Sequence, residues 1–268
     1  MFELSTEPQF ETEETQKQLE LRNSFNISKI TPAIKLEIEM DHNYQQEKFV
    51  EYVNTDTAES SIYSTSSVRM NNLFVRSISN HWSAGLRWEL GSSTRENHNF
   101  RTEFLPSIEY DLYPYSEATH RQLRFLYGAG YQYNNYLDTT VYNKMEEHLS
   151  LQSLGVAYQI QKKWGSINIS VTGSNYFHDF SKNRIELFSS VNIRILKGLS
   201  LRLFGRVAHI NDQLNLAKGE VSEAERLLQL RELETKYRID GGIEISYTFG
   251  SIYNNVVNPR FGNGGNFR

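Results

Sequence analysis

The chain has 268 residues, a net charge of −4, no cysteine and a mean hydropathy of −0.56. No apolar run approaches the roughly 18 to 20 residues that a membrane-spanning helix needs, so helical membrane proteins are excluded. The 28 basic residues against 32 acidic ones leave no positive excess for binding nucleic acid. The absence of cysteine removes disulfides, thiolate metal sites and cysteine nucleophiles.

Apolar and polar residues alternate along most of the chain. Between residues 33 and 44, for example, Leu36 and Ile38 alternate with Glu37 and Glu39. A period of two is typical of a β-strand with two different faces. The alternation slips phase near Asn71 and near Leu154, which indicates a β-bulge or a misplaced strand boundary. We therefore predict about twelve strands, at 2–11, 17–28, 33–44, 62–77, 81–90, 100–113, 120–134, 147–160, 166–177, 184–195, 199–210 and 237–249.

The connections between these segments alternate in length. Short connections are expected at 28–32, 79–80, 114–119, 161–165 and 196–198, and longer ones at 45–61, 91–99, 135–146 and 211–236. The connections at 12–16 and 178–183 are of middling length and fall on the long-loop side. A meander with tight turns at one end and long loops at the other is typical of outer-membrane barrels, which have turns in the periplasm and loops outside.

A soluble barrel or sandwich would also alternate, so the two classes must be compared. About eight strands already enclose a volume that side chains fill, and twelve strands would leave an apolar interior hollow. An outward apolar face and an inward charged face remove that difficulty and agree with the polar composition. The segments also match the roughly 9 to 11 residues that cross a membrane at a tilt better than the five or six of soluble strands.

Aromatic residues gather at both ends of the predicted strands. Such rings favour the two membrane interfaces, although strand-rich proteins carry many aromatics in any case. Near the short turns are Phe2, Trp82, Tyr110, Tyr158, Trp164, Tyr247 and Phe249, and near the long loops are Tyr44, Tyr133, Phe177 and Tyr237.

We predict a single transmembrane barrel domain at residues 1–249 and a periplasmic tail, rich in Asn and Gly, at 250–268. The first residues contain neither the basic n-region nor the apolar h-region of a signal peptide. Because an outer-membrane protein must be exported, we expect that at least a signal peptide has been removed.

Several stretches resemble an uncharacterised outer-membrane β-barrel family of Bacteroidetes. They run from Tyr113 to Glu117, Arg121 to Tyr127, Tyr176 to Arg184, Lys197 to Ser200 and Tyr247 to Gly262. The resemblance covers nearly the whole chain, is specific in the C-terminal third and is loose over the first hundred residues. Members of that family carry an N-terminal soluble region that is missing from this sequence. The resemblance implies a fold and a location, and no activity.

Two His-x-Ser pairs raise the possibility of an outer-membrane hydrolase. His81 and Ser83, and His148 and Ser150, have the spacing that phospholipase-type barrels use. Seven His in a Ser-rich chain give about one such pair by chance. His148 and Ser150 are predicted to face inward, and His81 lies at the short-turn end, so neither suits lipid hydrolysis. We expect no enzyme activity.

Metal and cofactor sites are not expected either. The adjacent pairs Asp41 and His42, and His178 and Asp179, point to opposite faces of a strand and cannot chelate one ion together.

Charged residues at alternate positions along the strands are predicted to face inward and to line the lumen of the barrel. Acidic residues dominate 33–44 and 100–113, whereas Arg dominates 184–210 on the opposite wall. If the lumen is open to water, these opposed rows of charge would orient polar solutes. If it is narrow, the charged side chains would pair as salt bridges and close it. A solvated polar lining without selectivity is the plainest interpretation. The predicted lining is Glu37, Glu39, Asp41, Arg87, Glu89, Glu109, Asp111, Arg124, Glu186, Arg194, Arg202, Arg206, Arg238, Asp240 and Glu244.

The connection 211–236 is the longest in the chain. Ser222 and Glu225 precede Leu227 in the pattern of a capping box, which predicts a short helix. Alternatively, Leu228 and Leu230 extend the last strand. Either arrangement could fold over the mouth or meet a partner, and a solvated loop is the plainer interpretation.

These patterns predict a passive pore, or the membrane anchor of a larger envelope protein, in a bacterial outer membrane with lipopolysaccharide outside. The alternative is a plugged barrel that binds an envelope partner through its outer loops or the missing N-terminal region. A hydrolase ranks third.

Overall fold

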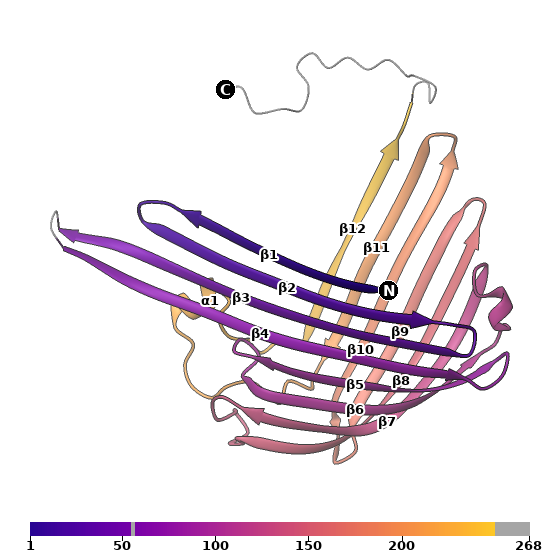
Figure 1. Ribbon diagram of the computed structural model, residues 1–268, viewed down its shortest axis with the longest axis horizontal. Helices are drawn as coiled ribbons and strands as arrows, with labels where there is room; N and C mark the ends of the chain where they lie inside the picture. The colour runs from indigo at the N-terminus through magenta and orange to yellow at the C-terminus, as the bar shows by residue number, and fades with distance from the viewer. Residues whose placement is uncertain (55–56, 250–268) are drawn as a thin grey trace.

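The structure, a computed structural model, describes residues 1–54 and 57–249 and consists of one antiparallel sheet (Figure 1). Each strand pairs with its neighbours in sequence, so the order runs from β1 to β12 without a crossover. The predicted all-β, twelve-stranded up-and-down topology is confirmed. The predicted tail at 250–268 lies outside the described residues.

The strands match the predicted segments closely, except in the lengths of β3 and β4 and at the start of β10. Strand β10 begins at Asp179, so most of the predicted connection 178–183 belongs to the strand and that prediction is wrong. Two short helices interrupt the connections, the 3₁₀ helix η1 at Tyr115–Glu117 and α1 at Glu223–Leu227. The strands are β1 Phe2–Thr12, β2 Gln16–Ile30, β3 Ile34–Asn54, β4 Thr57–Ser77, β5 Trp82–Ser93, β6 His98–Asp111, β7 Arg121–Tyr136, β8 Glu146–Lys162, β9 Gly165–Tyr176, β10 Asp179–Leu196, β11 Leu199–Ile210 and β12 Tyr237–Tyr247.

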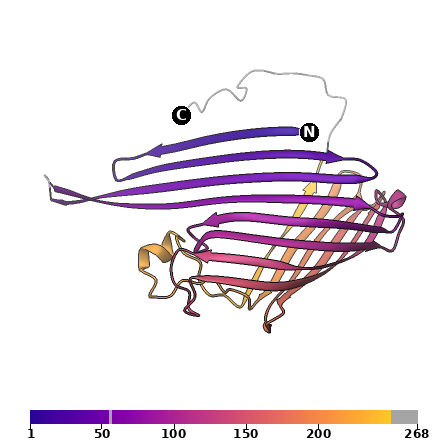
Figure 2. The ribbon, with the colours of Figure 1, turned by 60° about the horizontal axis from the view of Figure 1, so that its bottom comes forward.

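The sheet curls strongly but does not close into a barrel (Figures 1 and 2). Among the described residues, β1 pairs only with β2, and β12 pairs only with β11. Every other ladder follows a connection that sets its register, whereas a ladder between β1 and β12 would join the two strands farthest apart in sequence. Both edge strands are therefore left with a free side.

The predicted loop 45–61 is wrong, because β3 and β4 continue through most of it as a hairpin. Each strand has 21 residues, and their ladder runs on from Gln45↔Thr65 to Val50↔Ser60. The side chains stop alternating there while the backbone pairing persists, so a prediction based on alternation ends the strands too early. Figure 1 shows this hairpin projecting past the neighbouring strands.

No bulge occurs at the two positions where the sequence pattern slips. The registers run without a shift through Asn71 and through Leu154. The slips are changes in side-chain polarity alone. Leu73, for example, lies on the same face as Asn71, opposite Arg87 of β5.

The convex face of the sheet is mainly apolar and is uncovered. Ile239, Ile243 and Ile245 of β12 are 68%, 73% and 70% exposed. Within the described ranges, no helix is long and apolar enough to cross a membrane.

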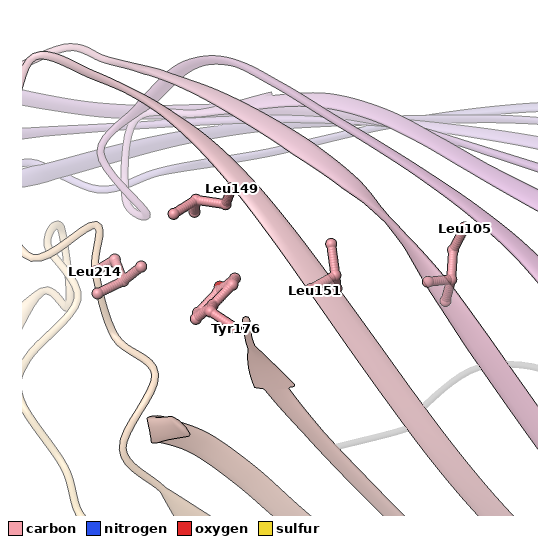
Figure 3. Close-up of a cluster of buried hydrophobic side chains, with 5 residues drawn as sticks. All are labelled: Leu105, Leu149, Leu151, Tyr176 and Leu214. Carbon is pink, nitrogen blue, oxygen red and sulfur yellow. The ribbon is translucent and has the colours of Figure 1, made fainter. Parts of the chain in front are cut away.

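A small buried apolar cluster lies on the concave face (Figure 3). Leu105 of β6, Leu149 and Leu151 of β8 and Tyr176 of β9 come from the wall of the sheet, and Leu214 comes from the connection between β11 and β12. This cluster fixes part of that connection against the inside of the sheet.

Close approach of β6 and β7 requires glycine at position 130. A Cβ added to Gly130 would overlap the carbonyl oxygen of Phe104 in the neighbouring strand. We expect Gly130→Ala to force the two strands apart and to lower the free energy of unfolding by about 1 to 3 kcal/mol. Urea unfolding of the detergent-refolded protein measures this change.

The matched control is Gly173→Ala in β9, because a Cβ at Gly173 meets nothing within 4 Å. Equal stability of the two variants would contradict the close packing of β6 against β7.

Candidate functional site: the concave face and its long connection

The strand registers place all fifteen predicted lumen residues on the concave face of the sheet. Arg202 and Glu244 face each other on β11 and β12 and form an ion pair of 3.8 Å. Arg124 contacts Glu109 at 3.7 Å. Both pairs are partly solvated, so each contributes little to stability. That this face lines a water-filled lumen stays a prediction.

Arg101 makes the predicted separation of charge less sharp. It lies on β6, within the supposedly acidic wall, and its guanidinium group contacts Glu103 at 2.8 Å and Glu89 at 3.5 Å. The acidic charges near it are therefore compensated locally. Strand β6 therefore presents both acidic and basic side chains on the concave face.

Two of the predicted lumen residues hold the turn between β6 and β7. Asp111 is fully buried, and its Oδ1 accepts bonds of 3.2 Å from the backbone N–H groups of Tyr113 and Leu123. Glu109 accepts a 3.0 Å bond from the hydroxyl of Tyr115, and burial raises the pKa of that hydroxyl. These carboxylates have a structural role at the turn.

The connection between β11 and β12, residues 211–236, folds back across the concave face; we call it the long connection. At its start, Asp212 receives two bonds from Arg184 of β10, with its Oδ2 3.0 Å from Nε and its Oδ1 2.9 Å from Nη2. Leu214 then enters the apolar cluster of Figure 3. A charged contact with β10 and an apolar contact with the cluster from β6, β8 and β9 thus attach the start of the connection to the concave face.

Asn97 joins three connections at one point. It is 5% exposed and has φ of 57°, a left-handed conformation that Asn tolerates. Its Nδ2 donates bonds of 2.9 Å to the carbonyls of Asp138 and Asn215, and its Oδ1 accepts a 2.7 Å bond from the N–H of Asp138. The connections 94–97, 137–145 and 211–236 are held together by this one side chain.

Backbone bonds extend the same attachment. The N–H of Val141 donates to the carbonyl of Leu216, and the N–H of Lys218 donates to the carbonyl of Thr139, both at 2.8 Å. Farther on, the N–H of Glu232 donates to the carbonyl of Arg95 at 2.9 Å. The long connection is therefore an ordered part of the site, and its interpretation as a solvated loop is wrong.

The predicted capping box is present at the start of α1. The hydroxyl of Ser222 accepts from the N–H of Glu225 at 3.2 Å, and the carboxylate of Glu225 accepts from the N–H of Ser222 at 2.8 Å. That backbone bond lowers the pKa of Glu225. Arg231 then lies between Glu225 and Asp138, at 3.5 and 3.7 Å. The alternative, in which Leu228 and Leu230 extend the last strand, is wrong because β12 begins at Tyr237.

Three cavities lie beside the long connection, and two of them are lined mainly by the concave face. The larger of these two, about 870 Å³, is open to solvent and is lined by residues of the strands from β4 to β12 and by residues 212–215 and 226–235. The smaller, about 560 Å³, lies against β3 to β6 and residues 227–230. The long connection therefore narrows the concave space at its loop end without filling it.

The His-x-Ser pairs do not form catalytic dyads. His148 and Ser150 lie on the convex face, opposite Tyr133 and Tyr131, so the predicted inward position is wrong. Leu149 and Leu151 take the inward positions because they pack in the apolar cluster. The Nδ1 of His148 bonds the hydroxyl of Tyr131.

The other pair is equally unsuited to nucleophile activation. Ser83 is bonded to Glu109 and Tyr115, whereas the Nδ1 of His81 lies 2.8 Å from the carbonyl of Asp111. No Ser–His hydrogen bond occurs in either pair among the described residues. In that part of the chain, no three His, Asp or Glu residues are placed to hold a metal ion.

Sequence reasoning missed several residues that build this site. Arg69 and Arg101 share the parity of the predicted lining and could have been found from it. Asn97 and Arg95 come from a connection that has no period, so no pattern indicated their position.

No protein-family model matches the chain, and no curated protein matches it either.

Removing the Asn97 side chain should release the long connection. Asn97→Gly keeps the left-handed backbone available and deletes three hydrogen bonds, each worth about 0.5 to 1.5 kcal/mol. We expect trypsin to cleave the long connection at Lys218 or Arg226 at least about ten times faster.

The control is Asn143→Gly, because Asn143 also has positive φ (58°) but makes one exposed bond, from Lys218. Equal cleavage rates in the two variants would show that Asn97 does not hold the three connections together.

Proposed function

We propose that this chain forms a β-barrel in a bacterial outer membrane and acts as a passive pore, with the long connection narrowing its outer mouth. The observation that carries the proposal is the division of one sheet into an apolar, exposed convex face and a charged concave face. Lipid would solvate the first face and water the second. In this orientation the short turns lie in the periplasm and the loop end lies among lipopolysaccharide.

The strand count and the sequence motifs support the same proposal. Twelve is an even number, as in bacterial single-chain barrels, and every strand has at least the eleven residues of β1 and β12. The stretches from Tyr176 to Arg184 and after Tyr247 resemble the Bacteroidetes barrel family, which we propose as the source of this domain.

The proposed barrel closes by antiparallel pairing of β1 with β12. The β1–β2 and β11–β12 registers put Ser5 and Glu244 on the same concave face, Ser5 three residues after the start of β1 and Glu244 three residues before the end of β12. Free N–H and C=O groups cost several kcal/mol each in hydrocarbon, so a bilayer strongly favours this pairing.

Disulfide trapping tests the closure. Because the chain has no native cysteine, only the introduced cysteines can form a disulfide. Ser5→Cys combined in turn with Gly242→Cys, Glu244→Cys and Ser246→Cys should give one efficiently oxidised pair in lipid vesicles. Ser5→Cys with Ser190→Cys on β10 is the control and should give none. Failure of all three β12 partners to cross-link would contradict closure.

Lipid contact on the convex face should appear in a pair of arginine substitutions. Ile243→Arg replaces a 73% exposed apolar side chain. In water it would cost little, whereas in a bilayer we expect a loss of about 2 to 4 kcal/mol in the free energy of unfolding. Urea unfolding in lipid vesicles measures the loss.

Ser190→Arg on the concave face of β10 is the control and should cost less than about 1 kcal/mol. Equal effects of the two substitutions would contradict the assignment of the faces.

Planar-bilayer recording tests the pore itself. Folded protein, identified by heat-modifiable migration in detergent gels, should give stepwise currents. The Asn97→Gly variant should give larger or noisier steps because its long connection is released. Silence from folded protein would reject the pore.

The second candidate function is a barrel that binds an envelope partner through its outer loops. The β3–β4 hairpin favours it, because β4 extends beyond the end of its ladder with β5 at Ser67 and carries polar residues there, such as Ser60, Ser61 and Ser64. Deleting residues 48–62 should abolish partner capture in that case and leave conductance unchanged.

A further inference from the structure

The larger cavity beside the long connection carries an excess of positive charge. Its lining contains ten Arg or Lys side chains against five Asp or Glu, although the whole chain has a net charge of −4. The field inside the cavity therefore has the opposite sign to the charge of the protein.

Most of the carboxylates in this lining already form ion pairs or hydrogen bonds with a few of its side chains. Asp212 and Glu186 both contact Arg184, at 2.9 and 3.2 Å. Glu103 contacts Arg101 at 2.8 Å, so these three acids contribute little to neutralising the other guanidinium groups.

Two arginines from different walls of the cavity have no such partner. Among the described residues, neither Arg87 of β5 nor Arg206 of β11 has a carboxylate within 4.0 Å. The register places Arg87 between Leu73 and Leu105. Arg206 is opposite Asp240, but Asp240 is paired with Arg238 at 3.6 Å. Both guanidinium groups are free to bind a solute.

Buried polar atoms at the edge of the same cavity also lack partners. Within the described part of the chain, the Nδ1 of His98 and the Nε of Arg101 are buried without a hydrogen bond, and His98 is only 7% exposed. Both residues line the cavity. Buried polar groups without partners are rare, so this part of the cavity wall keeps hydrogen-bonding capacity that the protein itself does not use.

We propose that this cavity binds the carboxylate or phosphate group of a small solute and makes the pore anion-selective. The planar guanidinium fork of Arg matches both oxyanions in a bidentate geometry. A volume of about 870 Å³ is in the range of sites for small molecules. Gln132, Ser153 and Ser174 add neutral hydrogen-bonding groups for the rest of the solute. The selectivity rests on the proposed pore, whereas the binding site does not.

Two measurements separate these claims. Reversal potentials under a KCl gradient give the ratio of chloride to potassium permeability, and isothermal titration calorimetry with citrate and with tripolyphosphate gives oxyanion affinity. We expect chloride to be preferred at least threefold and at least one of the two probes to saturate one site. Whichever probe saturates distinguishes a carboxylate site from a phosphate site.

The test variant is Arg87→Gln combined with Arg206→Gln, and the control is Arg194→Gln, which lies on the concave face but outside this cavity. The double variant should lose the chloride preference and weaken the probe at least tenfold, while the control keeps both. Heat-modifiable migration verifies that each variant is folded.

Each outcome decides a different claim. Saturable binding that depends on Arg87 and Arg206, without conductance, would support the site and reject the pore. Conductance without anion preference, together with no saturable binding, would overturn the site. Equal effects of the double variant and the control would overturn its location.

Discussion

Each strand of this sheet satisfies its backbone N–H and C=O groups on the strands directly before and after it in the chain, and among the described residues only β1 and β12 keep a free edge. In water those edge groups bond to solvent. In hydrocarbon they have no partner except each other. If the exposed convex face contacts lipid, as we propose, the same environment that suits its isoleucines also drives the edges together. Closure and lipid contact are therefore two consequences of one requirement.

This requirement determines where polar chemistry can occur. Strand pairing alternates the side chains between two faces, so most charged residues in the middle of the strands lie on the concave face when the convex face is apolar. The concave face then holds more charge than its own ion pairs neutralise. The long connection concentrates this effect, because Asp212, Leu214 and Asn215 attach it above the wall and leave arginine side chains lining the space beneath. A polar solute is the natural occupant of such a space.

The amount that could be predicted from the sequence varied with the physical origin of each feature. Alternation revealed twelve strands and the parity of residues such as Glu244 and Arg206, because a two-faced environment imposes a period of two. It failed for the outer half of β3 and β4, where neither face is apolar, and for His148 and Ser150, because Leu149 and Leu151 pack inward. Ser222 and Glu225 revealed α1 because a capping box is local. Asn97 was not predictable, since its partners Asp138 and Asn215 are distant in sequence.

The central claim is that the convex face meets lipid while the concave face meets water. Because the chain has no cysteine, single probes can report on neighbouring residues of one strand. Ile243→Cys and Glu244→Cys, each carrying a fluorescent label in lipid vesicles, should respond oppositely to a quencher confined to the acyl chains and to a water-soluble one. We predict that the label at 243 is quenched from the lipid and the label at 244 from water. Quenching of both labels from water alone would contradict a membrane-spanning sheet.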